Sequence, residues 1–219
     1  MLTSREFQDR LLKRAKACGL DFSPSLGQSL EIFYRALERW NARMNLTALA
    51  LEDLPEETAD RLILEPVAAS SFLGRGPIRW FDLGSGGGSP AVPLKLCRPE
   101  ARLIMVESKG RKAAFLREAV RTLTLQSAVV ENCRFEDLET IEDLKGAAEY
   151  VTVRAVRPDA AMFQTASCLL QPGGQLLVFG SPDQPEPDEA VASVHFKKPQ
   201  RYALSRVPKA MLTQYTAKG

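Results

Sequence analysis

The sequence predicts an α/β fold, in which a mostly parallel, twisted sheet carries helices on both faces and follows an N-terminal helical extension. Two observations support this. From Ile78 onward, short runs rich in β-branched and aromatic residues alternate with segments of helical periodicity. Before Ile78, apolar residues recur at helical spacing. A chain of 219 residues suits one domain with a modest extension.

The N-terminal part predicts three helices. Residues 3–18 and 25–43 each place apolar side chains on one face, and a third helix covers about 56–73. Gly19 stops the first helix, and Pro24 sits where the second can begin.

The remainder predicts alternating strands and helices. We expect strands at 78–83, 102–108, 127–133, 150–156 and 175–180, and helices at 91–96, 110–123 and 159–170. Residues 181–189 read as a Pro- and acid-rich surface loop, and the tail at 191–209 suggests two antiparallel strands, one of them carrying His195. We divide the chain into a helical extension, 1–74, packed on a core, 75–219.

Composition excludes several classes of protein. The four cysteines are scattered and the chain has one histidine, so no Cys/His zinc site and no other metal is expected. The N-terminus carries charge throughout and no apolar run reaches membrane-spanning length, which favours a cytoplasmic protein with no membrane partner. We expect a monomer. The net charge of +2 permits a nucleic-acid partner without indicating one.

The glycine-rich stretch FDLGSGGGSP, residues 81–90, follows the first predicted strand. It has no Gly-Lys pair, which argues against a phosphate-binding Walker A loop, and it lacks the third glycine of a dinucleotide fingerprint. The spacing Gly84-x-Gly86-x-Gly88, with Asp82 two residues before Gly84, resembles motif I of class I methyltransferases. Those enzymes have a Rossmann-like fold and bind S-adenosylmethionine (SAM).

The physical requirements of that ligand fit the loop. Glycines let the backbone pass beneath the amino-acid and ribose parts of SAM without Cβ atoms in the way. Asp82 can anchor loop amides or the ligand's amino group. Glu107, at the end of the second strand, can accept both ribose hydroxyls, although an acid there can also be a plain exposed residue.

Five stretches resemble the RsmG family, also called GidB, in order from about residue 26 to 180. They are RWNARMNLTAL (39–49), the glycine loop with Pro90 and Pro93, VESKGRKAAFLREA (106–119), CRFEDL (133–138) and VTVRAV (151–156). The resemblance implies a SAM-dependent enzyme that methylates N7 of a guanosine in 16S ribosomal RNA, with that RNA or the small ribosomal subunit as its partner.

The resemblance also implies site residues. Matched positions expected around SAM are Gly84, Ser89, Phe135, Glu136 and Arg154, which join Asp82, Gly86, Gly88 and Glu107 from the motif. Ser85, which lies within the same loop, is also expected to bind the cofactor. Guanine N7 has a lone pair and no proton to lose, so no general base is needed. Arg154 is the leading catalytic candidate, holding the SAM carboxylate or an RNA phosphate, with a structural ion pair as the alternative.

Several positions depart from the family pattern. The segment Arg61-Leu62-Ile63-Leu64-Glu65 lacks the histidine that the family has there. Phe179 stands where the family has a lysine, and Arg201-Tyr202 stands where the family has an Arg-His pair. Two alternatives therefore stay open: a SAM-dependent methyltransferase with a small-molecule or protein substrate, and a non-catalytic SAM-responsive RNA-binding module.

RNA contact would come from two groups of basic residues, which are Lys109, Arg111, Lys112 and Arg117 in or beside one helix and Lys197, Lys198 and Arg201 near the tail. A solvated helix face is the competing explanation for the first group. Trp40, Asn41 and Asn45 would either lie over the cofactor mouth or anchor the core and finish their helix.

Overall fold

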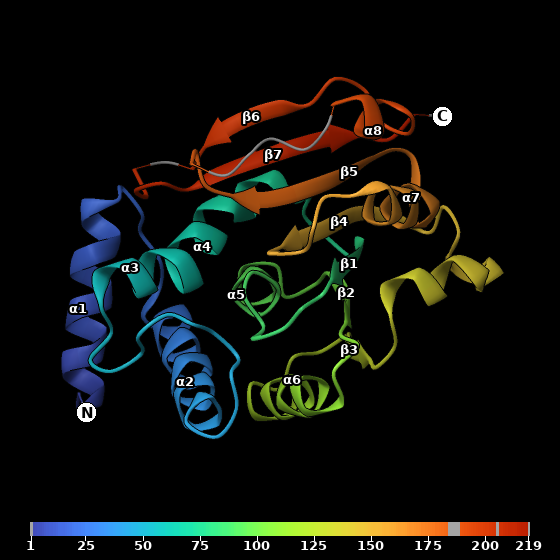
Figure 1. Ribbon diagram of the computed structural model, residues 1–219. Coiled ribbons are helices and arrows are strands. Elements are labelled where there is room, and N and C mark those ends of the chain that lie inside the picture. The colour runs from blue at the N-terminus through green and yellow to red at the C-terminus, as the bar shows by residue number, and fades with distance from the viewer. Residues whose placement is uncertain (1, 184–188, 205, 219) are drawn as a thin grey trace.

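The computed structural model describes residues 2–183, 189–204 and 206–218, and in that part of the chain one seven-stranded sheet forms the centre of the molecule (Figure 1). The spatial order is β3-β2-β1-β4-β5-β7-β6. The strands are β1 Arg79–Leu83, β2 Arg102–Val106, β3 Ala128–Glu131, β4 Ala148–Arg154, β5 Leu170–Gly180, β6 Gln200–Ala203 and β7 Met211–Thr216.

The first five strands are parallel, and β7 pairs antiparallel with both β5 and β6. The order reverses between β1 and β4, because the chain first winds from β1 to β3 and then crosses back. The carboxyl ends of strands at such a switch point form the usual ligand crevice of an open α/β sheet. The predicted fold class is therefore confirmed.

The longer helices are α1 Ser4–Ala17, α2 Pro24–Asn41, α5 Ala91–Cys97, α6 Gly110–Thr122 and α7 Ala160–Leu169. Thr3 and Ser23 cap the first two with side-chain acceptors, and Pro24 occupies the first turn of α2 as predicted.

The predicted third helix, 56–73, is helical but not continuous. It consists of α3 Glu56–Ala59, a π-helical turn Asp60–Leu64, α4 Glu65–Ala69 and a 3₁₀ turn Ser70–Phe72. Pro66 lies in the first turn of α4 and has no N–H to donate to the preceding turn. The irregularity is the expected response to that missing donor.

Helices cover both faces of the sheet. Side chains of α1, α2, α4, α5 and α6 share one apolar core with Trp80 of β1, whereas α7 and the 3₁₀ helix Phe135–Thr140 share another with Phe81 and Leu83. This alternation along β1 is the period of two expected for a strand buried on both sides. The division at residue 74 stays a prediction, although the N-terminal helices and the sheet contribute to one core.

Helix α2 lies against the glycine loop at two of its residues. A Cβ added to Gly88 would lie 3.1 Å from Phe33 Cε2, 3.2 Å from Val92 Cγ2 and 3.3 Å from Leu116 Cδ2. One added to Gly87 would lie 3.1 Å from the carbonyl oxygen of Leu46. The absence of side chains at these positions therefore allows α2 and its following loop to approach the sheet closely.

The tail differs from its prediction. Residues 189–193 form helix α8, and the two antiparallel strands are β6 and β7, of which β7 lies beyond the predicted range. His195 follows α8 and lies on no strand. The helical spacing of Ala192 and Phe196 explains the correction, because both are buried beside α7, and the Phe196 ring centroid is 5.9 Å from that of Phe163. Of the predicted loop at 181–189, residues 184–188 lie outside the described part.

None of the described helices has the length and apolar composition needed to cross a membrane. The described residues also contain no cluster of three or more His, Cys, Asp or Glu side chains suited to a metal ion.

Gly88→Ala tests the close packing of α2 on the loop. Gly76→Ala is the matched control, because Gly76 has a similar positive φ, +90° against +80° for Gly88, and open space around its missing Cβ. We expect the control to lose about 1–2 kcal/mol for the left-handed backbone, and Gly88→Ala to lose roughly 1–3 kcal/mol more from overpacking. Urea unfolding of both variants measures this, and equal losses would refute the packing argument.

Candidate active site

The glycine loop leaves β1 at Leu83 and reaches α5 through three residues in the left-handed region, Gly84 at φ +70°, Gly86 at φ +50° and Gly88 at φ +80°. A Cβ on Gly84 would lie 2.7 Å from Val156 Cγ2, a separation that real Cβ atoms do not show. Backbone amides of Gly84 and Ser85 both donate to the carbonyl of Val106, at 2.9 and 3.0 Å. The loop is therefore held against the end of β2 and touched by the segment that follows β4.

Asp82 is buried beneath this loop. Its Oδ1 accepts a hydrogen bond of 2.5 Å from Thr152 Oγ1, which itself accepts one of 2.8 Å from Trp80 Nε1. No described residue hydrogen-bonds to Asp82 Oδ2. Burial raises the pKa of Asp82 to about 6, against the opposing effect of its hydrogen bonds and of Arg154. A buried carboxylate oxygen without a partner is costly unless a ligand supplies one.

Glu107 joins the loop to helix α6. Its Oε2 accepts from the Gly86 amide at 2.9 Å, and its Oε1 accepts from the Lys109 amide at 2.8 Å. The side chain lies at the end of β2, as predicted, but it is buried rather than exposed. Each carboxylate oxygen can accept a second hydrogen bond, so both keep capacity for hydroxyl donors.

The two serines of the loop have different partners. Ser85 Oγ donates to the carbonyl of Asp82 at 2.9 Å, which tightens the turn. Ser89 Oγ donates to the carbonyl of Leu62 at 2.9 Å and accepts from Arg154 Nη1 at 2.8 Å. Ser89 thus connects the loop both to the helical extension and to β4.

Arg154 ends β4 and is largely buried, with 12% of its side chain exposed. Nη1 also donates to the carbonyl of Arg61 at 2.5 Å, and Nη2 lies 3.0 Å from Glu65 Oε2. Arg61 Nη1 contacts the same carboxylate oxygen at 2.9 Å. Burial raises the pKa of Glu65 and lowers that of Arg154, while the charge of each opposes the shift of the other.

The structural ion pair expected as the alternative role of Arg154 is therefore present, and a contact with cofactor or RNA stays a prediction. Within the described residues, Arg154 Nε and Glu65 Oε1 are buried without hydrogen-bond partners. The cluster of Arg61, Glu65 and Arg154 keeps unused polar atoms at the carboxyl end of β4.

Phe135 and Glu136 begin the 3₁₀ helix that follows β3, beyond β2 from the glycine loop. Phe135 is half-buried against the second core. The Arg134 side chain donates to Glu136 Oε1 at 3.2 Å, and this bond lowers the pKa of Glu136.

The structure thus gathers most of the predicted site at one edge of the sheet. Asp82, Gly84, Ser85, Gly86, Ser89, Glu107 and Arg154 are connected by hydrogen bonds or backbone continuity, while Gly88 packs against α2 and Phe135 and Glu136 lie apart after β3. Sequence reasoning missed Thr152 and Glu65. A polar residue inside the apolar run YVTV, and an acid four residues after Arg61, were the available signs.

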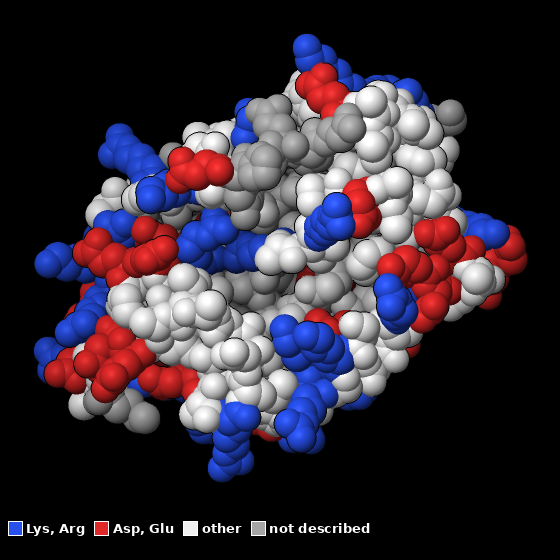
Figure 2. Space-filling model, in the orientation of Figure 1, with Lys and Arg blue, Asp and Glu red and all other residues white. Residues whose placement is uncertain are grey.

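The face that carries this edge is hollowed near its middle, and basic side chains border the hollow (Figure 2). The predicted RNA-binding residues Lys109, Arg111, Arg117, Lys197, Lys198 and Arg201 are exposed, and Lys112 is half-buried. Trp40 packs on α6, with its ring centroid 5.9 Å from that of Phe115. Asn41 Oδ1 accepts from the amides of Leu46 and Thr47, so this asparagine finishes α2, the second of the two roles considered.

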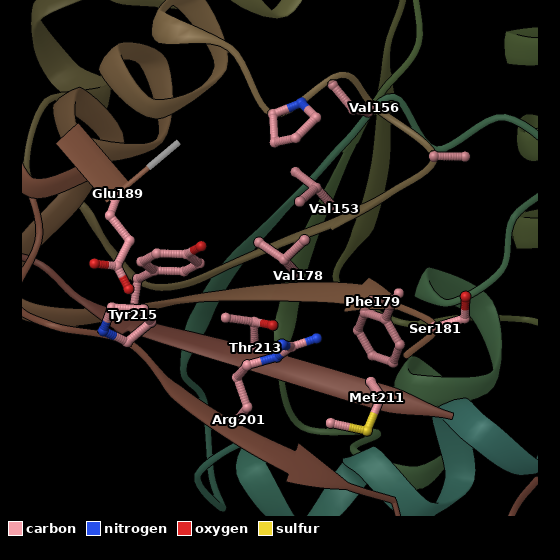
Figure 3. Close-up of a pocket in the computed structure, with 14 residues that line it drawn as sticks. Val153, Val156, Val178, Phe179, Ser181, Glu189, Arg201, Met211, Thr213 and Tyr215 are labelled. Carbon is pink, nitrogen blue, oxygen red and sulfur yellow. The ribbon is translucent and has the colours of Figure 1, made fainter. Parts of the chain in front are cut away.

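A pocket of about 220 Å³ opens beside the ends of β4, β5 and β7 (Figure 3). Its lining includes Val153, Val156, Val178, Phe179, Glu189, Arg201, Met211, Thr213 and Tyr215. Val156 also contacts the glycine loop, so the pocket and the loop are neighbours.

Residues 27–210 match the model of a family described as GidB, rRNA small subunit methyltransferase G. A Ribosomal RNA small subunit methyltransferase G of Xanthomonas campestris pv. campestris (strain B100) is 37% identical over 164 residues, which cover 75% of this chain and 71% of the relative. One of Stenotrophomonas maltophilia (strain K279a) is 39% identical over 159 residues, covering 73% and 70%. One of Roseiflexus sp. (strain RS-1) is 34% identical over 169 residues, covering 77% and 71%.

Solved structures with the same fold are more distant in sequence. A predicted O-methyltransferase from Agrobacterium tumefaciens aligns with a TM-score of 0.57 at 16% identity, covering 71% of this chain and 81% of that one. A SAM dependent methyltransferase from Aquifex aeolicus aligns with a TM-score of 0.54 at 12% identity, covering 71% and 89%. These likenesses concern the fold alone.

The raised pKa of Asp82 predicts a distinctive pH dependence. The folded protein holds this proton up to about pH 6, whereas the ordinary pKa is 3.8, so the stabilisation is complete below that lower value and disappears as the pH rises through 6. Relative to Asp82→Asn, which keeps the acceptor for Thr152, the wild type should lose about 2–3 kcal/mol of unfolding free energy between pH 4 and pH 7. Urea titrations across this range measure the difference, and parallel curves for the two proteins would contradict it.

Proposed function

The chain belongs to the GidB family, rRNA small subunit methyltransferase G, and we propose that it transfers a methyl group from SAM to N7 of a guanosine in 16S ribosomal RNA. The family match over residues 27–210 is the observation that carries this function. The order of the parallel strands and the glycine loop at their switch point support it.

The residues of the site fit the cofactor. SAM carries a cationic amino group, and Asp82 Oδ2 is a buried carboxylate oxygen without a partner among the described residues. SAM also carries a diol, and Glu107 has two oxygens with remaining acceptor capacity. Gly84 and Gly86 present backbone without side chains.

We assign the holding of the cofactor to Asp82, Gly84, Ser85, Gly86, Gly88, Ser89, Glu107, Phe135, Glu136 and Arg154. Asp82 would take the amino group and Glu107 the ribose hydroxyls. Ser85 and Ser89 fix the loop, Gly88 lets α2 pack against it, and the half-buried ring of Phe135 would pack on the adenine.

When bound, SAM supplies an electrophilic methyl group on a positively charged sulfur. The acceptor N7 has a free lone pair, so the protein needs no general base and its task is to position and align the guanine. Arg154 is the residue to which we assign the catalytic role, holding the SAM carboxylate or an RNA phosphate. Its bonds to Ser89, Arg61 and Glu65 fix its orientation before any ligand arrives.

We infer that 16S rRNA, free or in the small subunit, binds across the face with the basic hollow, and that the protein works as a metal-free monomer in the cytoplasm. We likewise retain 1–74 as a helical extension and 75–219 as the methyltransferase core.

The alternative substrates and the non-catalytic module rested on departures at Phe179, Tyr202 and the segment 61–65. Relatives at 34–39% identity that are named as rRNA methyltransferases favour the RNA substrate instead.

The direct test incubates the protein with labelled SAM and small subunits, or 16S rRNA, that lack the modification. We expect label on N7 of one guanosine, mapped by nuclease digestion and mass spectrometry. Transfer to another atom, or to small molecules with the rRNA unlabelled, would overturn the proposal.

Glu107→Gln should weaken SAM binding, since a neutral amide offers one acceptor atom where the carboxylate offers two. We expect the dissociation constant to rise about tenfold or more, the effect of removing hydrogen bonds to a charged group. Calorimetric titration measures it. Glu131→Gln, an exposed acid paired in register with Val106 on the next strand, is the matched control and should bind normally. Equal affinity of both variants would remove Glu107 from the cofactor site.

A further inference from the structure

The pocket in Figure 3 lies on the face of the sheet that α7 covers, whereas Arg154 points to the other face. The alternation of side chains along β4 sets Val153 in the second core and Arg154 opposite to it. Val178 and Thr213, which are in register on β5 and β7, line the pocket floor.

The pocket runs along β5. Tyr215 is in register with Leu176 at one end, and Leu212 is in register with Phe179 at the other. These positions are three residues apart, so the two ends are separated by roughly 10 Å. Figure 3 shows Glu189 and Tyr215 together at one end, and Phe179, Ser181 and Val156 toward the other.

The Phe179 end adjoins the cofactor site. Val156, which lines the pocket, comes so near Gly84 that a Cβ there would lie 2.7 Å from it. The Phe179 ring centroid is 4.9 Å from Arg154 Cζ, and Phe179 is in register with Arg154. A ligand in the pocket therefore has one end beside the glycine loop and the other beside Glu189.

The volume of the pocket suits a ligand the size of a single ring system. Its volume of about 220 Å³ is below the roughly 300 Å³ at which pockets for drug-sized molecules begin. Val153, Val178 and Met211 supply apolar walls. Tyr215 is fixed by the rings of Phe163 and Phe196, with centroids at 5.3 and 5.8 Å, so the wall at its end is rigid.

Glu189 gives this end of the pocket a specific chemistry. Its carboxylate accepts hydrogen bonds and donates none, and no described residue forms a hydrogen bond or ion pair with it. Guanine presents two adjacent donors, N1–H and the 2-amino group, on one edge, and its N7 lies at the opposite end of the ring system. Adenine has no such pair of donors.

On the basis of the proposed function, we infer that this pocket receives the target guanine, with N1–H and the 2-amino group on Glu189 and N7 toward Val156 and the glycine loop. The major groove of an RNA helix is too deep and narrow for side chains, so N7 becomes accessible when the base leaves its stack. Arg201 of β6 also lines the pocket.

The test compares RNA substrates that carry guanosine or inosine at the methylated position, because inosine lacks only the 2-amino group. The wild type should methylate the guanosine substrate at least about fivefold more efficiently. Glu189→Gln should lose most of that preference while binding SAM normally. Glu100→Gln, an exposed acid at the opposite ends of the strands, should keep it. An unchanged preference in Glu189→Gln would overturn the inference.

A binding measurement separates this inference from the proposed function. Calorimetry with GMP and IMP, in the presence of S-adenosylhomocysteine, requires no methyl transfer. Tighter binding of GMP that disappears in Glu189→Gln supports the pocket even if rRNA proves not to be the substrate. Methylated rRNA together with equal binding of GMP and IMP by the wild type would refute the pocket and leave the function intact.

Discussion

The connection between the N-terminal helices and the site depends on a missing hydrogen-bond donor at Pro66. Pro66 has no N–H to donate to the carbonyl of Leu62, four residues earlier, and Arg61 directly precedes Leu62. Both carbonyls accept side-chain hydrogen bonds, that of Arg61 from Arg154 Nη1 and that of Leu62 from Ser89 Oγ. The break in the helix thereby becomes an attachment point for β4 and for the glycine loop, which makes the N-terminal helices part of the site.

The site also concentrates charge where the protein excludes water. Asp82 and Glu65 are buried and Arg154 is largely buried, and each keeps at least one polar atom without a partner among the described residues. Such atoms reduce the stability of a fold and are retained where a ligand completes them. The glycine loop has no side chains at the positions where its neighbours come closest. Val156 approaches it at Gly84, and Phe33 approaches it at Gly88.

Local patterns determine most of the architecture, and non-local pairing determines the rest. Apolar periodicity located all five parallel strands and the main helices, and the glycine spacing located the ligand loop. These patterns did not reveal that the break at Pro66 connects the helices to the site. A proline in the sequence does not show which side chains donate hydrogen bonds to the carbonyls left without a partner. The Arg154–Glu65 ion pair joins segments that are far apart in the sequence, and apolar periodicity does not predict such contacts. The prediction for the tail was wrong because the spacing of Ala192 and Phe196 fits either a strand or a helix. The packing of Phe196 on Phe163 favours the helix.

The position of β7 has a consequence for how the protein matures. This strand follows β6 in the chain yet lies between β5 and β6 in the sheet. During synthesis, β6 therefore emerges with no neighbour to join, and β5 keeps an unpaired edge until residues 211–216 have left the ribosome. Translation that stops short of this strand leaves a sheet open to aggregation and a pocket without Met211, Thr213 and Tyr215. The sheet and the pocket of a newly made chain are therefore completed only when β7 pairs with β5.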